Sequence, residues 1–298
     1  MNQQLFIKFP NSITVQIKRE DLLHPFISGN KFRKLKYNLL QAKAENQETL
    51  LTFGGAFSNH IAATAYAGKE YGFKTIGIIR GDELREKIFE NPTLQFAQEC
   101  GMQFKFVTRE SYRHKAEADF IANLKQEFGD FYLVPEGGTN EFAVKGCEEI
   151  LTEDDAQFDF VCCAVGTGGT ISGLINSILP HQKVLGFPAL KGDFLKEDIC
   201  KFAQNQNWEL ITDYHFGGYG KVNPELIAFI NQFFEENNIP LDPIYTGKMV
   251  FGVMDLIEMD YFPENSKILL IHTGGLQGIN GMNIQLKSKN LPTIALDV

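Results

Sequence analysis

A glycine-rich loop in the second half of the sequence has the residue types that bind a phosphate. It runs Val165-Gly166-Thr167-Gly168-Gly169-Thr170, after an apolar segment and before a helix expected to begin near Ile171. Consecutive glycines let several backbone N–H groups point at one anion, and the N-terminus of a helix adds its positive end. Thr167 and Thr170 add two hydroxyl groups. The spacing matches neither a Walker loop nor a Rossmann fingerprint, so the loop alone indicates either a phosphate site or a capped turn.

A lysine occupies the expected start of another helix. The segment Ser28-Gly29-Asn30-Lys31 precedes apolar residues with helical spacing over 32–44. The dipole at a helix N-terminus favours anions, so we expect it to lower the pKa of Lys31. A neutral lysine amine is the nucleophile that Schiff-base chemistry requires. The alternative is that Lys31 belongs to a solvated basic face with Arg33, Lys34 and Lys36.

A third polar segment, Ser58-Asn59-His60, follows the glycine pair Gly54-Gly55. Ser58 or Asn59 is a natural N-cap for the helix expected next, and free N–H groups at such a helix start can hold a carboxylate. His60 is either a core or capping residue or a part of that substrate site. The sequence contains no arrangement of His, Cys, Asp and Glu typical of a metal site, and none typical of a Ser-His-Asp triad, so we expect neither.

The elements that must position these residues alternate along the chain. Short runs rich in Ile, Val and Phe alternate with helical patterns, which predicts β-α-β units and largely parallel sheets. Several predicted strands are followed by glycines, at 54–55, 137–138, 166–169 and 274–275. Ligands of open α/β sheets bind beyond the carboxyl ends of strands, so we expect these turns to share a cleft. The predicted strands are 50–53, 75–79, 104–107, 131–134, 158–164, 184–187 and 267–271.

The composition limits which binding partners and which cellular compartment we expect for this protein. The 298 residues are 44% hydrophobic and 22% charged, with a formal charge of -9, which is ordinary for a globular protein and unfavourable for binding nucleic acid or an anionic membrane. The N-terminal segment lacks the pattern of a signal peptide, and no apolar run approaches the roughly 20 residues that span a bilayer. Five cysteines without a C-x-x-C pair suit a reducing compartment. We therefore expect a soluble, cytoplasmic protein.

The order of the motifs resembles one family, the 1-aminocyclopropane-1-carboxylate (ACC) deaminase and D-cysteine desulfhydrase family of pyridoxal-phosphate (PLP) enzymes, which have the tryptophan-synthase-β-like fold (fold type II). Glu136, before the glycine pair at 137–138, departs from the usual pattern. The resemblance covers nearly the whole chain. The matching segments are Lys18-Arg19-Glu20-Asp21-Leu22, Gly29-Asn30-Lys31-Phe32-Arg33-Lys34-Leu35, Gly54-Gly55-Ala56-Phe57-Ser58-Asn59-His60, Pro135-Glu136-Gly137-Gly138-Thr139-Asn140, Gly166-Thr167-Gly168-Gly169-Thr170, Gly218-Tyr219-Gly220, Asp242-Pro243-Ile244-Tyr245-Thr246-Gly247-Lys248 and His272-Thr273-Gly274-Gly275.

The resemblance also implies the architecture. We expect an α/β protein of two domains, each an open and mostly parallel sheet flanked by helices, with PLP in the cleft between them. The strand grouping places a small domain at 46–135 and a large, PLP-binding domain at 1–45 and 136–298. The family further implies a homodimer.

Several matching residues are implied to bind the cofactor. Lys31 matches the lysine that forms the Schiff base with PLP, and Asn59 matches the asparagine that hydrogen-bonds the ring oxygen. Lys34 is expected to lend charge to the phosphate, and Thr246 or Thr273 to face the pyridine nitrogen. The phosphate loop corresponds to Gly166, Thr167, Gly168, Gly169 and Thr170.

Other matching residues are implied to act on the substrate. Ser58, Asn59 and His60 correspond to the substrate-binding segment, and Ser58 also matches a serine placed near the reacting atoms. Tyr219 and Tyr245 match two active-site tyrosines, either of which is expected to handle protons or to tune the amine. The sequence does not separate their roles.

The implied reaction is an α,β-elimination or deamination of a small amino acid that yields a 2-oxo acid and ammonia. A hydroxyl group at the pyridine nitrogen favours the protonated ring less than a carboxylate does. The ACC deaminase branch carries glutamate after the second tyrosine, whereas this chain has Thr246, so a D-cysteine-desulfhydrase-like activity is favoured. Three alternatives stay open: ACC deamination, another PLP reaction such as racemisation or dehydration, and a non-catalytic ligand-binding protein.

Overall fold

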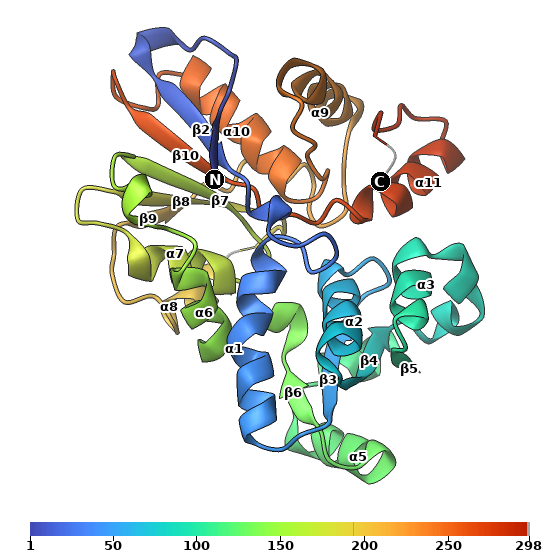
Figure 1. Ribbon diagram of the computed structural model, residues 1–298. Coiled ribbons are helices and arrows are strands. Elements are labelled where there is room, and N and C mark those ends of the chain that lie inside the picture. Colours follow the sequence, from blue (N-terminus) through green and yellow to red (C-terminus); the bar gives the residue numbers. More distant parts are fainter. Residues whose placement is uncertain (193, 297–298) are drawn as a thin grey trace.

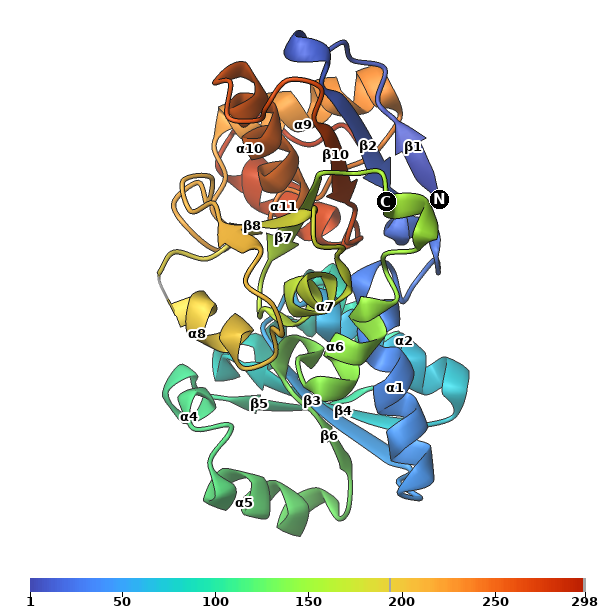
Figure 2. The same ribbon diagram turned by 90° about the vertical axis from the view of Figure 1, so that its left-hand side faces the viewer.

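Two β-sheets organise the chain in the computed structural model, which describes residues 1–192 and 194–296 (Figures 1 and 2). The six-stranded sheet has the order β1-β2-β10-β7-β8-β9, and the four-stranded sheet has the order β5-β4-β3-β6. Every pair of neighbouring strands is parallel except β1 and β2. The strands are β1 (Asn2–Gln4), β2 (Thr14–Lys18), β3 (Thr49–Gly54), β4 (Lys74–Arg80), β5 (Gln103–Val107), β6 (Tyr132–Val134), β7 (Phe160–Val165), β8 (Lys183–Pro188), β9 (Trp208–Leu210) and β10 (Lys267–Ile271).

Helices cover both sheets, and none of those in the described residues is long and apolar enough to cross a bilayer. Helices α9 and α10 lie by the larger sheet, and α2, α3 and α5 lie by the smaller one (Figure 1). The helices are α1 (Asn30–Ala44), α2 (Asn59–Tyr71), α3 (Pro92–Glu99), α4 (Arg109–Arg113), α5 (Ala118–Phe128), α6 (Glu141–Glu148), α7 (Gly169–Ser177), α8 (Phe194–Cys200), α9 (Pro224–Asn237), α10 (Thr246–Glu258) and α11 (Gly278–Ser288). Short 3-10 turns lie at Pro10–Ser12, Glu20–Leu22, Asp82–Glu90, Glu136–Gly138 and Glu153–Asp155.

Both faces of the larger sheet are buried, as expected for a sheet with helices on two sides. Strand β7 shows this clearly, because Cys162 and Ala164 pack into the core on one face while Val161, Cys163 and Val165 pack into the core on the other. Such strands appear in the sequence as continuous apolar runs. The seven predicted strands are all present, and the α/β class with two mostly parallel sheets is confirmed.

Strands β1, β2 and β9 were not predicted from the sequence. β1 (Asn2–Gln4) is entirely polar, and β9 (Trp208–Leu210) contains only three residues with no buried position. The boundaries of the two domains stay a prediction. Helix α1 belongs to the expected large domain by its position in the chain, yet its Leu35 and Leu39 lie in one apolar cluster with residues of the smaller sheet.

Helix α6 fixes the spacing between two helices that begin at the predicted site. Gly146 on α6 packs so closely against α1 that a Cβ there would lie 2.0 Å from the carbonyl oxygen of Arg33. Gly173 on α7 allows a similar approach, since its Cβ would lie 2.5 Å from the Cβ of Cys147. Because α1 carries Lys31 and α7 follows the glycine loop, these two contacts set the distance between the lysine and the loop.

Adding one methyl group at Gly146 should push α1 away from α6. A Gly146→Ala variant is expected to lose about 1–3 kcal/mol of unfolding free energy, because the backbone of α1 has to shift to remove the overlap. Urea unfolding followed by circular dichroism measures this loss. Lys145→Ala, at the exposed neighbouring position on the same helix, is the control and should change stability by less than about 0.5 kcal/mol. Equal stabilities for the two variants would contradict the close packing.

Candidate active site

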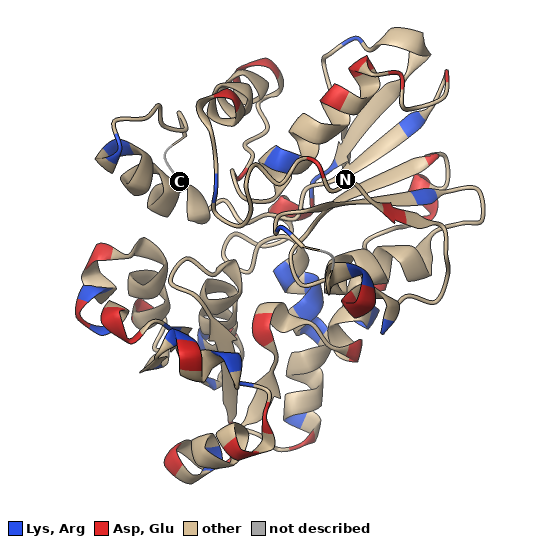
Figure 3. Cartoon of the chain, turned by 180° about the vertical axis from the view of Figure 1, so that it is seen from behind, with Lys and Arg blue, Asp and Glu red and all other residues tan. Residues whose placement is uncertain are grey.

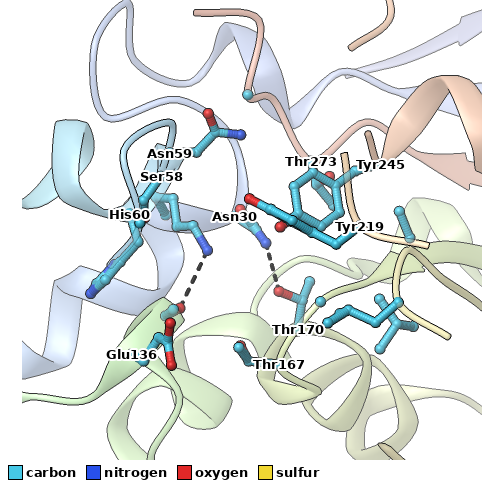
Figure 4. Close-up of a pocket in the computed structure, with 18 of the residues that line it drawn as sticks. Asn30, Ser58, Asn59, His60, Glu136, Thr167, Thr170, Tyr219, Tyr245 and Thr273 are labelled. Atoms are coloured by element: carbon cyan, nitrogen blue, oxygen red, sulfur yellow. Dashed lines mark hydrogen bonds between the residues drawn. The ribbon is translucent and has the colours of Figure 1, made fainter. Parts of the chain in front are cut away.

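A cavity of about 680 Å³ lies where the two sheets meet, and all four glycine turns predicted to share a cleft line it. Residues from α1, from the start of α2 and from the loop before α7 face one another across it (Figure 4). The lining includes these predicted residues: Lys31, Lys34, Ser58, Asn59, His60, Gly166, Thr167, Gly168, Thr170, Tyr219, Tyr245 and Thr273. Gly169 and Thr246 are the predicted site residues that do not line the cavity.

Lys31 lies on the first turn of α1 with its amine directed across the cavity. Its Nζ donates a hydrogen bond to the carbonyl oxygen of Gly137, at 3.3 Å. Among the residues that the structure describes, no carboxylate is hydrogen-bonded to the amine. Burial, and then the positive charge of Lys34, lower the pKa of Lys31 well below its ordinary value. The amine is therefore available as a nucleophile nearer to neutral pH than an exposed lysine.

Lys34 lies one turn further along α1, buried behind the glycine loop. Its Nζ donates to the carbonyl oxygen of Gly137 at 3.1 Å and to Thr139 Oγ1 at 3.0 Å. A Cβ at Gly169 would lie 3.1 Å from that Nζ and 2.8 Å from Thr139 Oγ1, so this glycine makes room for the lysine rather than lining the cavity. Burial lowers the pKa of Lys34, and an anion held by the loop would favour its charged form.

The start of α1 is joined to both ends of the site. The backbone N–H of Asn30 donates to the carbonyl oxygen of Thr273, at 3.2 Å. Gly29 adopts φ +60°, and a Cβ there would lie 2.0 Å from the same oxygen, so only glycine fits this approach. The Asn30 side chain donates to Thr170 Oγ1 at 2.8 Å (Figure 4). Asn30 was not predicted as a site residue, although it lies beside Lys31 in the matching motif.

The start of α2 supplies the opposite wall. Ser58 is the N-cap, because its Oγ accepts a hydrogen bond from the backbone N–H of Ile61 at 3.3 Å. Asn59 is the first residue of the helix, and its buried Oδ1 has no hydrogen-bond partner among the described residues. A buried amide without a partner is costly in a folded protein, so this atom indicates a ligand.

His60 is buried just behind that wall and is 2% exposed. Its Nε2 lies 2.8 Å from Thr52 Oγ1, and that hydroxyl also donates to the carbonyl oxygen of Val134. With the hydroxyl proton in the second bond, the Thr52 oxygen is left as an acceptor for a proton on Nε2. Burial, and then the charges of Lys31 and Lys34, lower the pKa of His60 well below its ordinary value, against a smaller opposing effect of the Pro135 carbonyl. His60 is therefore a neutral wall residue.

Two tyrosines close the cavity on the side of the larger sheet. The rings of Tyr219 and Tyr245 meet edge to face with centroids 6.2 Å apart (Figure 4). Burial raises the pKa of both hydroxyls, and the neighbouring Tyr219 raises that of Tyr245 further. Gly166 leaves space for Tyr245, since a Cβ there would lie 3.2 Å from its ring. Both hydroxyls are therefore proton donors at neutral pH.

The two threonines predicted near the pyridine nitrogen differ in position. Thr246 is fully buried, and its Oγ1 donates to Asp242 Oδ1 at 2.8 Å, so its hydroxyl stabilises the turn that begins α10. The same carboxylate accepts from the backbone N–H of Tyr245 at 2.9 Å. Thr273 lines the cavity, and its hydroxyl has no hydrogen-bond partner in the described part of the chain. Of Thr246 and Thr273, only Thr273 therefore has a hydroxyl that a ligand in the cavity can reach.

The rim of the cavity contains charged residues that the motifs did not single out as site residues. Both oxygens of Glu136 are engaged: Oε1 accepts from the Tyr112 hydroxyl at 2.8 Å, and Oε2 pairs with Lys115 Nζ at 3.2 Å. Arg80, the last residue of β4, lies over the Tyr112 ring with its guanidinium carbon 5.6 Å from the centroid. A lone residue at a strand end has no spacing pattern, so Arg80 could not be identified from the sequence.

These features together fit PLP. The loop over 166–170 and the Lys34 ammonium suit its phosphate, and the Lys31 amine, whose pKa burial lowers, suits its aldehyde. The unpartnered Asn59 amide and the free Thr273 hydroxyl suit the polar atoms of its ring. Each of these groups lines one cavity, and no acidic side chain hydrogen-bonds either lysine within the described residues.

Comparisons with known proteins agree with this geometry. Residues 8–274 match the family described as "Pyridoxal-phosphate dependent enzyme". A Pyrococcus horikoshii protein named "Putative 1-aminocyclopropane-1-carboxylate deaminase" is 33% identical over 283 residues, which cover 89% of this chain and 85% of that protein. An Arabidopsis thaliana protein named "Bifunctional D-cysteine desulfhydrase/1-aminocyclopropane-1-carboxylate deaminase, mitochondrial" is 30% identical over 91% of this chain and 74% of its own length.

A solved structure described as an ACC deaminase homologue is similar to this chain throughout. It superposes with a TM-score of 0.83 at 30% sequence identity, covering 97% of this chain and 93% of that one. Because the match covers nearly the whole of both chains, the fold is shared, including both sheets.

Lys248 holds the loop that carries Tyr219. It lies on α10, is 2% exposed, and its Nζ donates to the carbonyl oxygens of His215 and Gly218 at 2.9 and 3.0 Å. Burial lowers the pKa of Lys248 to about 8, against an opposing effect of Asp242. In the unfolded chain a lysine has a pKa of about 10.4.

Lys248 should therefore give the stability of the protein a specific pH dependence. Between pH 8 and about 10.4 the unfolded chain holds more protons at this residue than the folded chain, so its contribution to the unfolding free energy rises with pH across that window. Below pH 8 both states are protonated and the contribution is constant. We expect the stability advantage of the natural protein over Lys248→Met to grow as pH rises from 8 to about 10, measured by urea unfolding. Exposed Lys289→Met is the control, and a pH-independent difference for Lys248→Met would contradict the assignment.

Proposed function

Because the chain belongs to the pyridoxal-phosphate-dependent enzyme family, we propose that it is a lyase that cleaves D-cysteine, or a closely similar small amino acid, by α,β-elimination. The observation that carries the proposal is the Lys31 amine, whose pKa is lowered by burial and by Lys34, beside the glycine loop over 166–170. The Arabidopsis thaliana relative with both activities in its name supports this substrate class.

PLP, when bound, supplies an aldehyde that captures amines and a ring that delocalises electrons from the substrate Cα. We assign Lys31 to hold the cofactor covalently and the loop with Lys34 to hold its phosphate. Asn59 is assigned to the ring oxygen and Thr273 to the pyridine nitrogen. A threonine hydroxyl at that nitrogen, in place of a carboxylate, moderates the withdrawal of electrons by the ring.

The altered pKa values separate the roles of Lys31 and the tyrosines. Lys31, once the substrate amine has taken its place, is the base for the Cα proton, because its lowered pKa leaves the amine unprotonated more readily. Tyr219 and Tyr245 have raised pKa values, so their hydroxyls serve as proton donors to the departing thiolate. Neither assignment uses Ser58 or the backbone at the start of α2. We assign these groups to bind the substrate carboxylate.

The bonds of the elimination balance without an oxidant. The Cα–H electrons become the Cα–Cβ double bond, the Cβ–S electrons leave with sulfur, and the sulfur takes a proton to become sulfide. Water then replaces the nitrogen, so D-cysteine and water give pyruvate, ammonia and hydrogen sulfide.

ACC deamination is the second candidate, because two of the relatives carry that activity in their names. The ACC deaminase branch that the sequence resembles carries glutamate at the position of Thr246. In this chain the Thr246 hydroxyl donates a hydrogen bond to Asp242. The absence of a glutamate at this position supports D-cysteine over ACC as the substrate.

The cellular setting is part of the proposal. All five cysteines are free, as is usual in a reducing compartment, which supports the cytoplasm. We also propose a homodimer, supported by large apolar side chains exposed at Leu22, Leu23 and Phe26.

D-cysteine should be consumed by the protein reconstituted with PLP. We expect the visible absorbance of the bound cofactor to change on addition of D-cysteine, with sulfide and pyruvate released in equal amounts. L-cysteine and ACC, assayed in parallel by the sulfide and the 2-oxo acid formed, define the preference. Lys31→Ala should lose turnover and the visible absorbance of lysine-bound cofactor, while Lys36→Ala, exposed on the same helix, should keep both. No product from D-cysteine with a spectrally intact cofactor would overturn the proposal.

A further inference from the structure

Arg80 is a cation that lines the cavity. Among the described residues, it has no hydrogen-bond or ion-pair partner. The other cations of the lining are engaged: Lys31 and Lys34 by the Gly137 carbonyl, Arg109 by Glu83 at 2.6 Å and Lys115 by Glu136. In the described part of the chain, Arg80 makes neither a hydrogen bond nor an ion pair, and its guanidinium lies over the face of the Tyr112 ring.

The nearby carboxylate of Glu136 contacts other groups than Arg80. Glu136 has one oxygen occupied by the Tyr112 hydroxyl and the other by Lys115. These contacts also hold Tyr112, the ring on which the guanidinium rests, so the arginine is positioned before any ligand arrives. A guanidinium placed in this way binds carboxylates well, because two of its N–H groups match the two oxygens.

The position of Arg80 indicates which anion it meets. A Cβ at Gly55 would lie 3.4 Å from its Nη2, so the guanidinium borders the turn that leads to Ser58 and the start of α2. The phosphate loop lies across the cavity, where Thr167 and Thr170 are found in Figure 4. Acidic and basic residues are interspersed over the outer elements (Figure 3), and the formal net charge is -9. The surface as a whole therefore does not attract anions, so an anion has to be bound by local groups.

We infer that Arg80 binds the α-carboxylate of the substrate, together with the turn over 55–58 at the start of α2. The inference rests on the proposed action on a small amino acid and adds a residue to its recognition. Arg80 is a binding residue in this account, so its loss weakens the affinity for carboxylate-bearing ligands and leaves the cofactor in place.

The test compares two amines that differ by the carboxylate alone. D-alanine and ethylamine, neither of which carries a leaving group, are titrated into the PLP-loaded protein and followed by the change in cofactor absorbance. Loss of a charged hydrogen bond is expected to weaken D-alanine binding about 10- to 100-fold in Arg80→Gln, with no change for ethylamine. Arg80→Lys should recover part of the loss, and Arg109→Gln, whose natural side chain is paired with Glu83, is the charge-matched control.

Each outcome decides the assignment. Equal weakening of both amines in Arg80→Gln, or no weakening of D-alanine, would overturn the role of Arg80. A natural protein that binds neither D- nor L-alanine better than ethylamine would also overturn it. A loss seen with D-aspartate but not with D-alanine would move Arg80 to the side chain of the substrate and contradict the inference. Selective binding of D-alanine through Arg80 without sulfide release from D-cysteine would keep the inference and overturn the proposed reaction instead.

Discussion

The position of helix α1 relative to the glycine loop is the constraint on which the site depends. Gly146 brings α6 against the backbone of α1 at Arg33, and Gly173 brings α7 against α6 at Cys147. At its start, α1 is fixed to β10 through Gly29 and the carbonyl of Thr273. Side chains at these contacts would separate the lysines from the loop. Small residues in the packing therefore determine the distance between an amine and an anion site that lie about 135 residues apart in the chain.

Burial without paired charges gives the site its reactivity. Lys31 and Lys34 lie one helical turn apart and face carbonyl and hydroxyl oxygens rather than carboxylates, so desolvation lowers the pKa of each. The same desolvation raises the pKa of Tyr219 and Tyr245. One low-dielectric cavity thus favours the neutral amine of the lysines and the neutral hydroxyl of the tyrosines, because burial disfavours the charged form of either kind of group.

The sequence predicts the strands, and most of the residues that line the cavity, for a physical reason. Strands buried on both faces, such as β7, appear as continuous apolar runs, and glycine turns at their ends identify the cleft. Lys31 and the loop over 166–170 are recognisable because chemistry requires those residue types at those positions. The side-chain direction of Thr246 was not predictable, since it depends on Asp242 accepting its hydroxyl. Arg80 depends on the packing of Tyr112 and on Glu136 being occupied, and neither leaves a local pattern.

We propose Lys31 as the residue that holds the cofactor. The most direct measurement is borohydride reduction of the PLP-loaded protein, followed by proteolysis and mass spectrometry of the modified peptide. The account predicts that the cofactor mass is found on Lys31 alone, with Lys34 unmodified three residues away. Cofactor mass on Lys34, or on a lysine outside the cavity, would contradict it.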